Sequence, residues 1–330
     1  MIAKIAEECG IAPQTVRRVL NSGLGDVSPE EFQKIRDTAG ELGYGNLNRT
    51  HTLAILFEEE SGKGLTHTFF ATVLNAFKNE AESRGYDVTF INHQSATGTR
   101  SYLEHCLDKN ADGVCMVCGD FGSPEIRELV DSGIPCVTVD HFFKGVPAVL
   151  SDNETGVRKL VEYAMSMGHK KIAFIHGHNN SIVTRSRISQ FCNTMAFHGL
   201  EVLPGYIRAG LYDDIVLTRT IVTEMLKLPD PPTCILLPND MVYIGAMEAA
   251  HQLGLKRPDD VSMAGYDGIA LTQVLQPPLT TIRQSNAELG RAAAERLIDC
   301  IENPESASRK PRIFPVELLK GGTIAAPKQE

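Results

Sequence analysis

No hydrophobic run in this sequence is long enough to cross a membrane. A membrane-spanning helix needs roughly 20 consecutive apolar residues, and no stretch of the 330 residues approaches that length. The opening MIAKIAEECG carries two glutamates where a secretory signal peptide has an apolar stretch. We therefore expect a protein that has no membrane segment and works in the cytoplasm.

The eight cysteines show no regular spacing, and a chain of 330 residues buries enough surface to fold without disulfides. This pattern fits a reducing compartment. Cys115 and Cys118 have the spacing of a metal or redox pair, but they lie in the apolar run DGVCMVCG, which predicts a buried strand. Residues three apart on a strand point to opposite faces, so we expect core thiols here and no metal site.

The motifs of several enzyme classes are also missing. The sequence has no glycine-rich phosphate loop with its lysine, no dinucleotide fingerprint after the first predicted strand, and no histidine pair at helical spacing. His176 and His178 would lie on one side of a strand, but no third metal ligand is evident. We therefore expect neither an enzyme nor a metal or cofactor site.

Acidic residues predominate, with a formal net charge of −9, and the length suggests two globular domains or slightly more. Residues 1–51 contain six Lys or Arg and seven Asp or Glu residues, so this segment carries −1 and the remainder −8. This balance argues against loose coating of DNA. It leaves open a specific contact through a local basic face.

The first fifty residues predict three short helices over Ile2–Glu8, Pro13–Leu20 and Pro29–Leu42. Gly10 separates the first two helices, and Ser28 with Glu31 forms the pattern of a capping box before the third. Helices this short are stable only when they pack on one another. A helix, a glycine-containing turn and a second helix are typical of helix-turn-helix DNA-binding modules.

The second predicted helix carries one polar stripe. Gln14, Arg17, Arg18 and Asn21 follow the i, i+3, i+4, i+7 spacing of a single helix face, opposite Val16, Val19 and Leu20. Gln can pair with adenine and Arg with guanine, and both reach phosphates, so the stripe suits a recognition helix in the major groove. The alternative is the solvated face of an ordinary helix.

From Thr52 onward, short apolar strands alternate with amphipathic helices, which predicts an α/β fold with parallel sheets. Strands are expected at 52–57, 87–92, 113–117, 135–140, 148–151, 171–176, 233–238, 261–267 and 312–319, and helices at 69–84, 102–109, 124–131, 154–167, 187–198, 214–227, 241–253 and 288–301. The alternation restarts near Val149, which indicates two doubly wound halves with a cleft between them.

The stretch IAKIAEECGIAPQTVRRVLN, followed by ELGY, resembles the N-terminal domain of the lactose-repressor (LacI/GalR) family. The likeness continues in order through THTFF, GHKKIAFI, TRSR, PNDMVYIG, VSMAGYDG and PPLTTIRQ. It implies a small all-α helix-turn-helix head and a periplasmic-binding-protein-like core of two doubly wound parallel-sheet subdomains. The expected bounds are 1–44 for the head, 45–51 for a shortened linker and 52–330 for the core, with an N-subdomain at about 52–147 and 285–305 and a C-subdomain at about 148–284 and 306–322.

On this resemblance Gln14 and Arg18 would read bases, with Thr15 and Asn21 near the DNA backbone. The DNA-binding surface is expected to comprise Pro13, Gln14, Thr15, Arg17, Arg18, Asn21 and Leu47. Three positions depart from the family pattern, since Lys4 stands for an acid, Ala12 for a serine and Arg17 for a serine. The linker is too short for the usual hinge helix, and Leu47 is the only apolar candidate left to wedge into the minor groove, so we expect weaker or differently shaped DNA binding.

The resemblance also implies a ligand site formed by Phe70, Asp140, Arg187, Asn239, Asp267 and Gln284. Carboxylates, a guanidinium and amides together can bracket the hydroxyls of a polyol. Asp140 and Asn239 have the alternative of being helix caps or turn residues, and Asp267 beside Gly268 of being a turn residue. Relatives also bind nucleobases, and Phe69, Phe70 and Phe143 would suit stacking.

We expect a DNA-binding transcriptional regulator, a repressor, that acts as a homodimer on an operator with two-fold symmetry. A small molecule, a sugar or related polyol, would control it from the core. The alternatives are a solute-binding sensor whose DNA-binding head is weakened or lost, and a cleft enzyme of sugar metabolism. No leucine heptads follow VELLKGG, so a tetramer through a terminal coiled coil is not expected.

Overall fold

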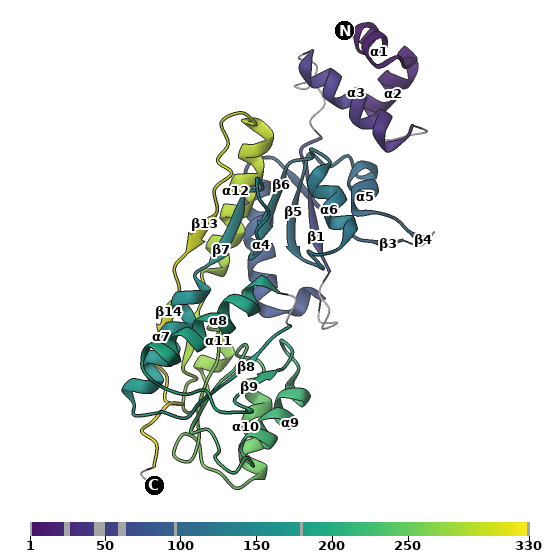
Figure 1. The fold of residues 1–330 in the computed structure, drawn as a ribbon. Coiled ribbons are helices and arrows are strands. Elements are labelled where there is room, and N and C mark those ends of the chain that lie inside the picture. Colours follow the sequence, from purple (N-terminus) through teal and green to yellow (C-terminus); the bar gives the residue numbers. More distant parts are fainter. Residues whose placement is uncertain are drawn as a thin grey trace. The chain divides into compact units, whose positions relative to one another are not determined.

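The computed structural model describes residues 2–22, 27–42, 50–58, 64–95, 98–178 and 181–328. The chain divides into two compact units (Figure 1). Unit 1 comprises Met1–Glu60, Thr72–Val149 and Ala287–Arg312, and unit 2 comprises Ser61–Ala71, Leu150–Asn286 and Ile313–Glu330.

Three helices form the N-terminal head: α1 (Ile2–Cys9), α2 (Pro13–Ser22) and α3 (Pro29–Glu41). The predicted break between α1 and α2 is confirmed by the positive φ of 71° at Gly10. The predicted capping box is also confirmed, because Ser28 Oγ accepts a hydrogen bond from the Glu31 N–H at 3.2 Å and the Glu31 carboxylate accepts one from the Ser28 N–H at 3.0 Å.

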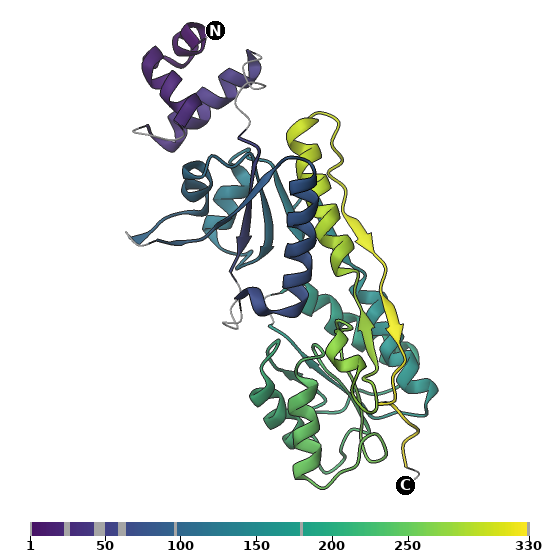
Figure 2. The ribbon, with the colours of Figure 1, turned by 180° about the vertical axis from the view of Figure 1, so that it is seen from behind.

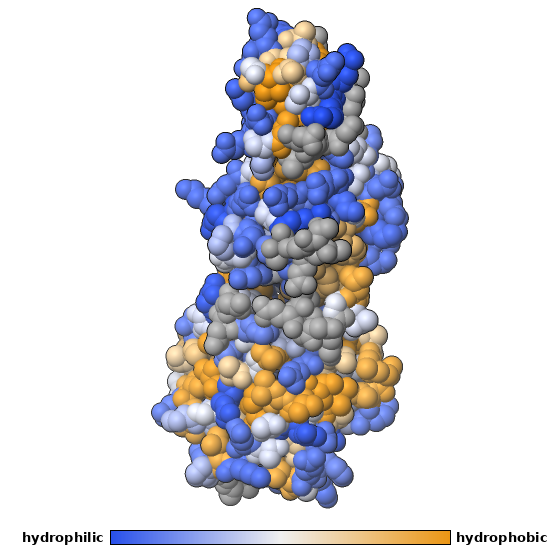
Figure 3. Space-filling view, turned by 90° about the vertical axis from the view of Figure 1, so that its right-hand side faces the viewer, coloured by the Kyte–Doolittle hydropathy of each residue, from blue (hydrophilic) through white to orange (hydrophobic). Residues whose placement is uncertain are grey.

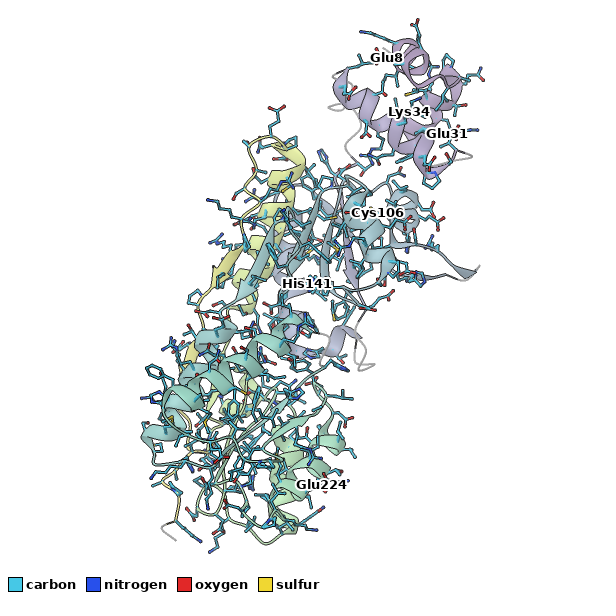
Figure 4. All side chains as sticks on the ribbon, viewed as in Figure 1. Glu8, Glu31, Lys34, Cys106, His141 and Glu224 are labelled. Atoms are coloured by element: carbon cyan, nitrogen blue, oxygen red, sulfur yellow. The ribbon has the colours of Figure 1, made fainter. Side chains whose placement is uncertain are left out.

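Apolar side chains from all three helices of the head are buried and belong to the same hydrophobic cluster as residues of β1 (Thr52–Phe57). Ile5, Val16, Val19, Phe32 and Ile35, which come from all three helices, are buried. Lys34 belongs to the head (Figure 4). Its ammonium donates to the carbonyl oxygen of Cys9 at 2.9 Å and so caps the end of α1. Because each helix contributes one apolar face, the opposite face of α2 is left to solvent.

Most of a six-stranded sheet lies in unit 1. Its order is β2 (Asp87–Ile91), β1 (Thr52–Phe57), β5 (Gly113–Cys118), β6 (Cys136–Val139), β7 (Ala148–Ser151) and β13 (Arg312–Phe314). The pairs from β2 to β7 are parallel. The four central residues of β1 are buried, as expected for a parallel strand that is covered on both faces.

Helices cover both faces of this sheet (Figures 1 and 2). On one face lie α4 (Thr68–Ser83) and α12 (Asn286–Glu302), and on the other lie α5 (Tyr102–Asp108) and α6 (Pro124–Asp131). Gly290 in α12 lies directly on the backbone of Val73 in α4, and a Cβ at this position would overlap the Val73 carbonyl oxygen. The two helices can therefore approach this closely only because residue 290 is glycine.

Unit 2 contains a four-stranded parallel sheet in the order β9 (Ile207–Ala209), β8 (Ile172–His176), β10 (Cys234–Leu236) and β11 (Ser262–Ala264). Two helix pairs accompany it: α7 (Asn153–Ser166) packs with α8 (Ile182–Phe197), and α9 (Ile215–Met225) with α10 (Tyr243–Gln252). The smaller elements are η1 (Gly64–Thr66), α11 (Ala270–Gln273), the antiparallel pair β12 (Thr281–Arg283) with β14 (Glu317–Leu319), and the pair β3 (Gln94–Ser95) with β4 (Gly98–Thr99).

The predicted α/β class with parallel sheets and a helical head is confirmed, but some bounds were wrong. The helix expected to begin at Arg187 begins at Ile182, where the Ser181 side chain caps it. The strand expected over 312–319 is interrupted at Pro315 and becomes β13 and β14 in different sheets, since proline cannot donate a ladder hydrogen bond. His178 lies outside β8, which ends at His176.

The thiols of Cys115 and Cys118 sit on β5. Cys115 is fully buried, and this burial raises the pKa of its thiol well above the usual range. Within the described ranges, no group of three His, Cys, Asp or Glu residues is placed to hold a metal ion. None of the described helices is both long enough and apolar enough to span a bilayer.

The contact between α9 and α10 provides a test of the packing. A Cβ at Gly245 would overlap the carbonyl oxygen of Ile215, so Gly245→Ala forces the two helices apart. We expect a loss of about 1–3 kcal/mol in the free energy of unfolding, measured by urea denaturation. The control is Gly40→Ala, whose methyl group enters open space on α3 and should be neutral or stabilising by up to about 1 kcal/mol. An equal effect of both substitutions would contradict the close contact.

Candidate functional site

The exposed face of α2 forms the first candidate site. Gln14, Arg17 and Arg18 are exposed on this helix, and Thr15 is half-buried. Pro13 is the first residue of α2, where its missing N–H costs nothing. Asn21 lies in the last turn of the helix but its side chain is outside the described residues, and so is Leu47.

This face is basic although the chain is acidic. α2 contains Arg17 and Arg18 and no acidic residue. Among the described residues, no carboxylate forms an ion pair with Arg17. The face presents one amide and two guanidinium groups to solvent from one rigid helix, which matches the donor and acceptor edges of bases in the major groove.

The second candidate site is in unit 2, after the strands. Asn239 follows β10, Asp267 follows β11 and Gln284 comes directly after β12. The carboxyl ends of parallel strands meet at one edge of a sheet, where ligands bind in open α/β folds. The Asn239 amide donates to Asp213 Oδ1 at 2.5 Å, and the Gln284 amide donates to Asp267 Oδ1 at 2.7 Å.

Arg187 enters this region from α8. It lies in the second turn of the helix, and not at the helix start that the sequence predicted. Its Nε donates to Asn153 Oδ1 at 2.8 Å and its Nη1 to the Pro238 carbonyl oxygen at 3.2 Å. The guanidinium carbon lies 3.5 Å from the centroid of the Tyr266 ring. The side chain is only 5% exposed, so these contacts hold a buried cation in one orientation.

Asp267 is electrostatically coupled to the other members of the site. Burial raises the pKa of Asp267 to about 8; the Arg187 charge lowers it, Asp240 raises it, the Gln284 hydrogen bond lowers it and Asp213 raises it. The backbone of Asp267 has φ of 106°, a region that non-glycine residues rarely adopt. We call these side chains the polar cluster; its members are Asn153, Arg187, Asp213, Asn239, Tyr266, Asp267 and Gln284.

Phe70 reaches the polar cluster through His67. The rings of His67 and Phe70 are 4.8 Å apart, and His67 Nε2 lies 3.7 Å from Asp213 Oδ2. Asp140 belongs to unit 1, follows β6 with φ of 49°, and donates its backbone N–H to the Val149 carbonyl oxygen at 2.9 Å. The structure therefore groups five of the six predicted ligand residues within unit 2.

Asn239 also makes the kind of local backbone contact that is expected of a helix cap or turn residue. Asn239 Oδ1 accepts from the Val242 N–H at 3.4 Å while its amide donates to Asp213, so one side chain does both. The sequence predictions missed His67, Asn153, Asp213 and Tyr266 as members of this region. His67 and Tyr266 lie inside the motifs THTFF and VSMAGYDG, but no sequence signal marked Asn153 or Asp213.

Comparisons with known proteins bear on both sites. A family model described as periplasmic binding proteins and sugar binding domain of LacI family matches residues 50–321. The HTH-type transcriptional repressor PurR of Vibrio parahaemolyticus is 30% identical over 327 residues, covering 93% of this chain and 94% of that protein. The ribose operon repressor of Haemophilus influenzae is 28% identical over 97% of this chain and 96% of that protein.

A solved structure shares the fold of the whole chain. The crystal structure of the Lac repressor dimer bound to operator and the anti-inducer ONPF has a TM-score of 0.72 to this protein and 22% sequence identity. The match covers 99% of both chains. It therefore includes the helical head as well as the rest of both units.

Asp267 generates a prediction about pH and stability. Its pKa is raised from an ordinary value of 3.8 to about 8 because the folded protein favours the protonated carboxyl group. The stability that this group contributes is therefore fully present below about pH 4 and is lost as the pH rises towards 8. Asn cannot ionise and can still accept from Gln284. We expect Asp267→Asn to stabilise the protein, by on the order of 1–3 kcal/mol near pH 8 and little near pH 4, in thermal unfolding.

The control is Asp260→Asn. The hydrogen bond from Lys328 and that from the Lys256 N–H lower the pKa of the Asp260 carboxyl. Its contribution to stability is therefore present above pH 4 and lost as the pH falls, so this variant should gain no stability at pH 8. A pH-independent effect of Asp267→Asn would contradict the assignment.

Proposed function

The chain belongs to the LacI family, and from that premise we propose that it is a DNA-binding transcriptional repressor controlled by a small ligand. The observation that carries this proposal is the exposed basic face of α2 on a helical head in the same chain as a core with a buried polar cluster. Relatives similar over nearly the whole chain are named as repressors, which supports the repressor over a solute-binding sensor that has lost its head. They are regulators, and we propose that this chain likewise acts without catalysis.

DNA binding is assigned to the head. We propose that Gln14 and Arg18 contact base edges in the major groove, that Thr15, Asn21 and Arg17 contact the backbone or neighbouring bases, and that Pro13 sets the start of the helix against DNA. Leu47 is the proposed minor-groove contact, on the family resemblance alone. The proposed bounds are 1–44 for the head, 45–51 for the linker and 52–330 for the core. A repressor works where the DNA is, so we place the protein in the cytoplasm.

Ligand binding is assigned to the polar cluster. We propose that Arg187, Asn239, Asp267 and Gln284 hold the hydroxyl groups of a sugar or related polyol, with Phe70 against its apolar face. The convergence of a guanidinium, two amides and a carboxyl group supports this chemistry. Asp140 of unit 1 is a further candidate on the resemblance alone. A ligand that binds one state of the core more tightly than another shifts the equilibrium between them, and DNA affinity with it.

The proposed assembly is a homodimer. Four large apolar side chains are exposed on three helices of unit 2: Val216 on α9, Ile244 on α10, and Leu271 and Val274 on or next to α11. Gly245 lies against Ile215, and the Asp240 carboxylate accepts from the Ile269 N–H at 2.9 Å, so these helices start close together. Apolar residues also gather across this unit in Figure 3. A second copy of the chain would cover such a patch and present two heads to a symmetric operator.

To test DNA binding, the full-length protein is first used to select the sequences that it binds from a pool of random DNA. On the selected site, Arg18→Ala should weaken binding about 10- to 100-fold and reduce the slope of log affinity against log salt by about 1, because one charged contact is lost. Gel-shift titrations at several salt concentrations measure both quantities.

The matched control is Arg158→Ala, which removes the same charge from the α7 surface of unit 2 and should leave affinity and slope unchanged. Failure of the selection to enrich any sequence would refute the proposed repressor function. Equal losses in the two variants would refute the role of α2.

Dimerisation is tested at Val216, which is 62% exposed. Val216→Asp places a charge in the proposed interface and should raise the dimer dissociation constant at least about tenfold, since a buried unpaired charge is costly. Phe197→Asp is the control, because Phe197 is an exposed apolar residue at the end of α8 outside the patch. Sedimentation velocity measures the dimer dissociation constant of both variants. An unchanged dissociation constant in Val216→Asp would contradict this interface.

A further inference from the structure

The chain is held in place just before it enters the sheet of unit 1. Strand β1 begins at Thr52, and its pairing with β2 begins at the same residue. Thr50 and His51 precede the strand, yet the N–H groups of both donate to one side chain, the carboxylate of Asp112. The distances are 3.3 Å from Thr50 N to Oδ1 and 2.8 Å from His51 N to Oδ2. Both carboxylate oxygens are therefore used on two consecutive backbone donors.

Asp112 is itself held in a fixed position. The residue is only 7% exposed, and its backbone N–H donates to the Thr52 carbonyl oxygen at 2.8 Å. Two positions earlier, the Asn110 carbonyl oxygen accepts the Thr50 hydroxyl at 2.5 Å. Hydrogen bonds to a carboxylate are stronger than those between neutral groups, and burial removes the competition from water. The short segment 110–112 thus holds the chain at residue 50 through three hydrogen bonds to backbone or hydroxyl donors.

His51 is held from a second side. Its carbonyl oxygen accepts from the Asp87 N–H at 2.7 Å, and its ring lies edge-on to the Tyr86 ring with 5.1 Å between the centroids. The Tyr86 hydroxyl in turn donates to Glu302, the last residue of α12, at 3.2 Å. The φ of His51 is 52°, a strained value for a residue with a Cβ, which persists only where the surroundings dictate it. We call the following residues the linker clamp: Thr50, His51, Tyr86, Asn110 and Asp112.

The linker clamp lies at the edge of the sheet where the strands begin. Its residues come from the segments directly before β1, β2 and β5, which are adjacent and parallel in the sheet of unit 1. Parallel neighbours start at the same edge of a sheet. Three neighbouring strands therefore fix the direction in which the chain from the head enters the core of unit 1.

This fixed point limits the reach of the head. Seven residues separate Leu42, the last described residue of the head, from Thr50. At about 3.5 Å per residue, a stretch of this length spans at most roughly 25 Å. When one head of a dimer is bound to DNA, a short connection raises the effective concentration of the second head at its half-site, provided that the spacing of the half-sites matches. Release of Thr50 and His51 would lengthen the connection and free its direction.

We propose that Asp112 is a positioning residue for DNA binding, whose carboxylate fixes the end of the linker on unit 1 and so limits the reach and direction of the head. Asp112 belongs neither to α2 nor to the polar cluster. This inference rests on the proposed function as a dimeric repressor, and it assigns to the linker clamp the matching of two heads to one operator.

The experiment compares two DNA duplexes with the full-length protein, by fluorescence anisotropy. One duplex carries the complete site obtained by selection from random DNA, and the other carries a single half-site. Asp112→Ala should weaken binding to the complete site about 5- to 20-fold, because the effective concentration of the second head falls. Binding to the half-site should not change, because the contacts of α2 are untouched.

A second measurement varies the distance between the half-sites. In the wild-type protein, one base pair added between the half-sites should weaken binding, because the heads are held at a set distance. The same insertion should weaken binding less in Asp112→Ala, whose linker ends are free. A loss of folded protein would lower binding to every duplex alike, so this readout separates positioning from stability.

Three further variants complete the set. Asp112→Asn keeps one carbonyl oxygen as an acceptor and should give a smaller loss, which keeps the proposal testable if the alanine variant does not fold. Thr50→Val removes only the hydroxyl bond to Asn110 and should also weaken binding to the complete site selectively. The matched control is Asp87→Ala, which removes an exposed acid from the start of β2 and should bind both duplexes like the wild type.

Each outcome has a definite meaning. Unchanged affinity of Asp112→Ala for the complete site, an equal loss on both duplexes, or an unchanged response to half-site spacing would each overturn the role of Asp112. These results leave DNA binding by α2 intact. If the wild-type protein selects no sequence, the repressor function fails, and this inference fails with it.

Discussion

A buried charge must be compensated, and the polar cluster of unit 2 is arranged around the buried charge of Arg187. Its guanidinium is met by the Asn153 side chain, the Pro238 carbonyl oxygen and the face of Tyr266. Solvent does not screen this charge, so the groups near it are held in fixed positions. Tyr266 can approach α7 because residue 156 is glycine. Any other residue there would have a Cβ that overlaps the Tyr266 hydroxyl oxygen. The polar cluster thus depends on a packing detail in α7 as well as on its own side chains.

The head uses charge in the opposite way. Its guanidinium groups are exposed on α2, and the apolar side of this helix is buried against α1 and α3. In unit 2 most members of the polar cluster are buried, and the backbone of Asp267 is strained, with φ of 106°. The two candidate sites therefore differ in exposure: the guanidinium groups of α2 are in contact with solvent, and the Arg187 guanidinium of unit 2 is not.

Local signals predicted the elements well where side-chain periodicity or capping is decisive. The capping box of α3 and the buried run of β1 are such cases. The start of α8 was missed because the apolar periodicity of that helix is weak, although Ser181 was available as a cap. The strand over 312–319 was drawn as continuous because the pattern did not show that Pro315 separates two sheets. For the candidate site, the sequence supplied Arg187, Asn239, Asp267 and Gln284 through motifs, but not the buried partners that orient them.

The sequence by itself determined the order of helices and strands, the basic stripe on α2 and the family, because these depend on residues close together in the chain or on motifs in a fixed order. Only the tertiary structure decided which polar side chains meet. Asp213 reaches Asn239, and Arg187 reaches Asn153, across 26 and 34 positions of sequence. Such pairs are set by how parallel strands bring their carboxyl ends to one edge, and by which groups are then shut away from water. No local pattern records that information.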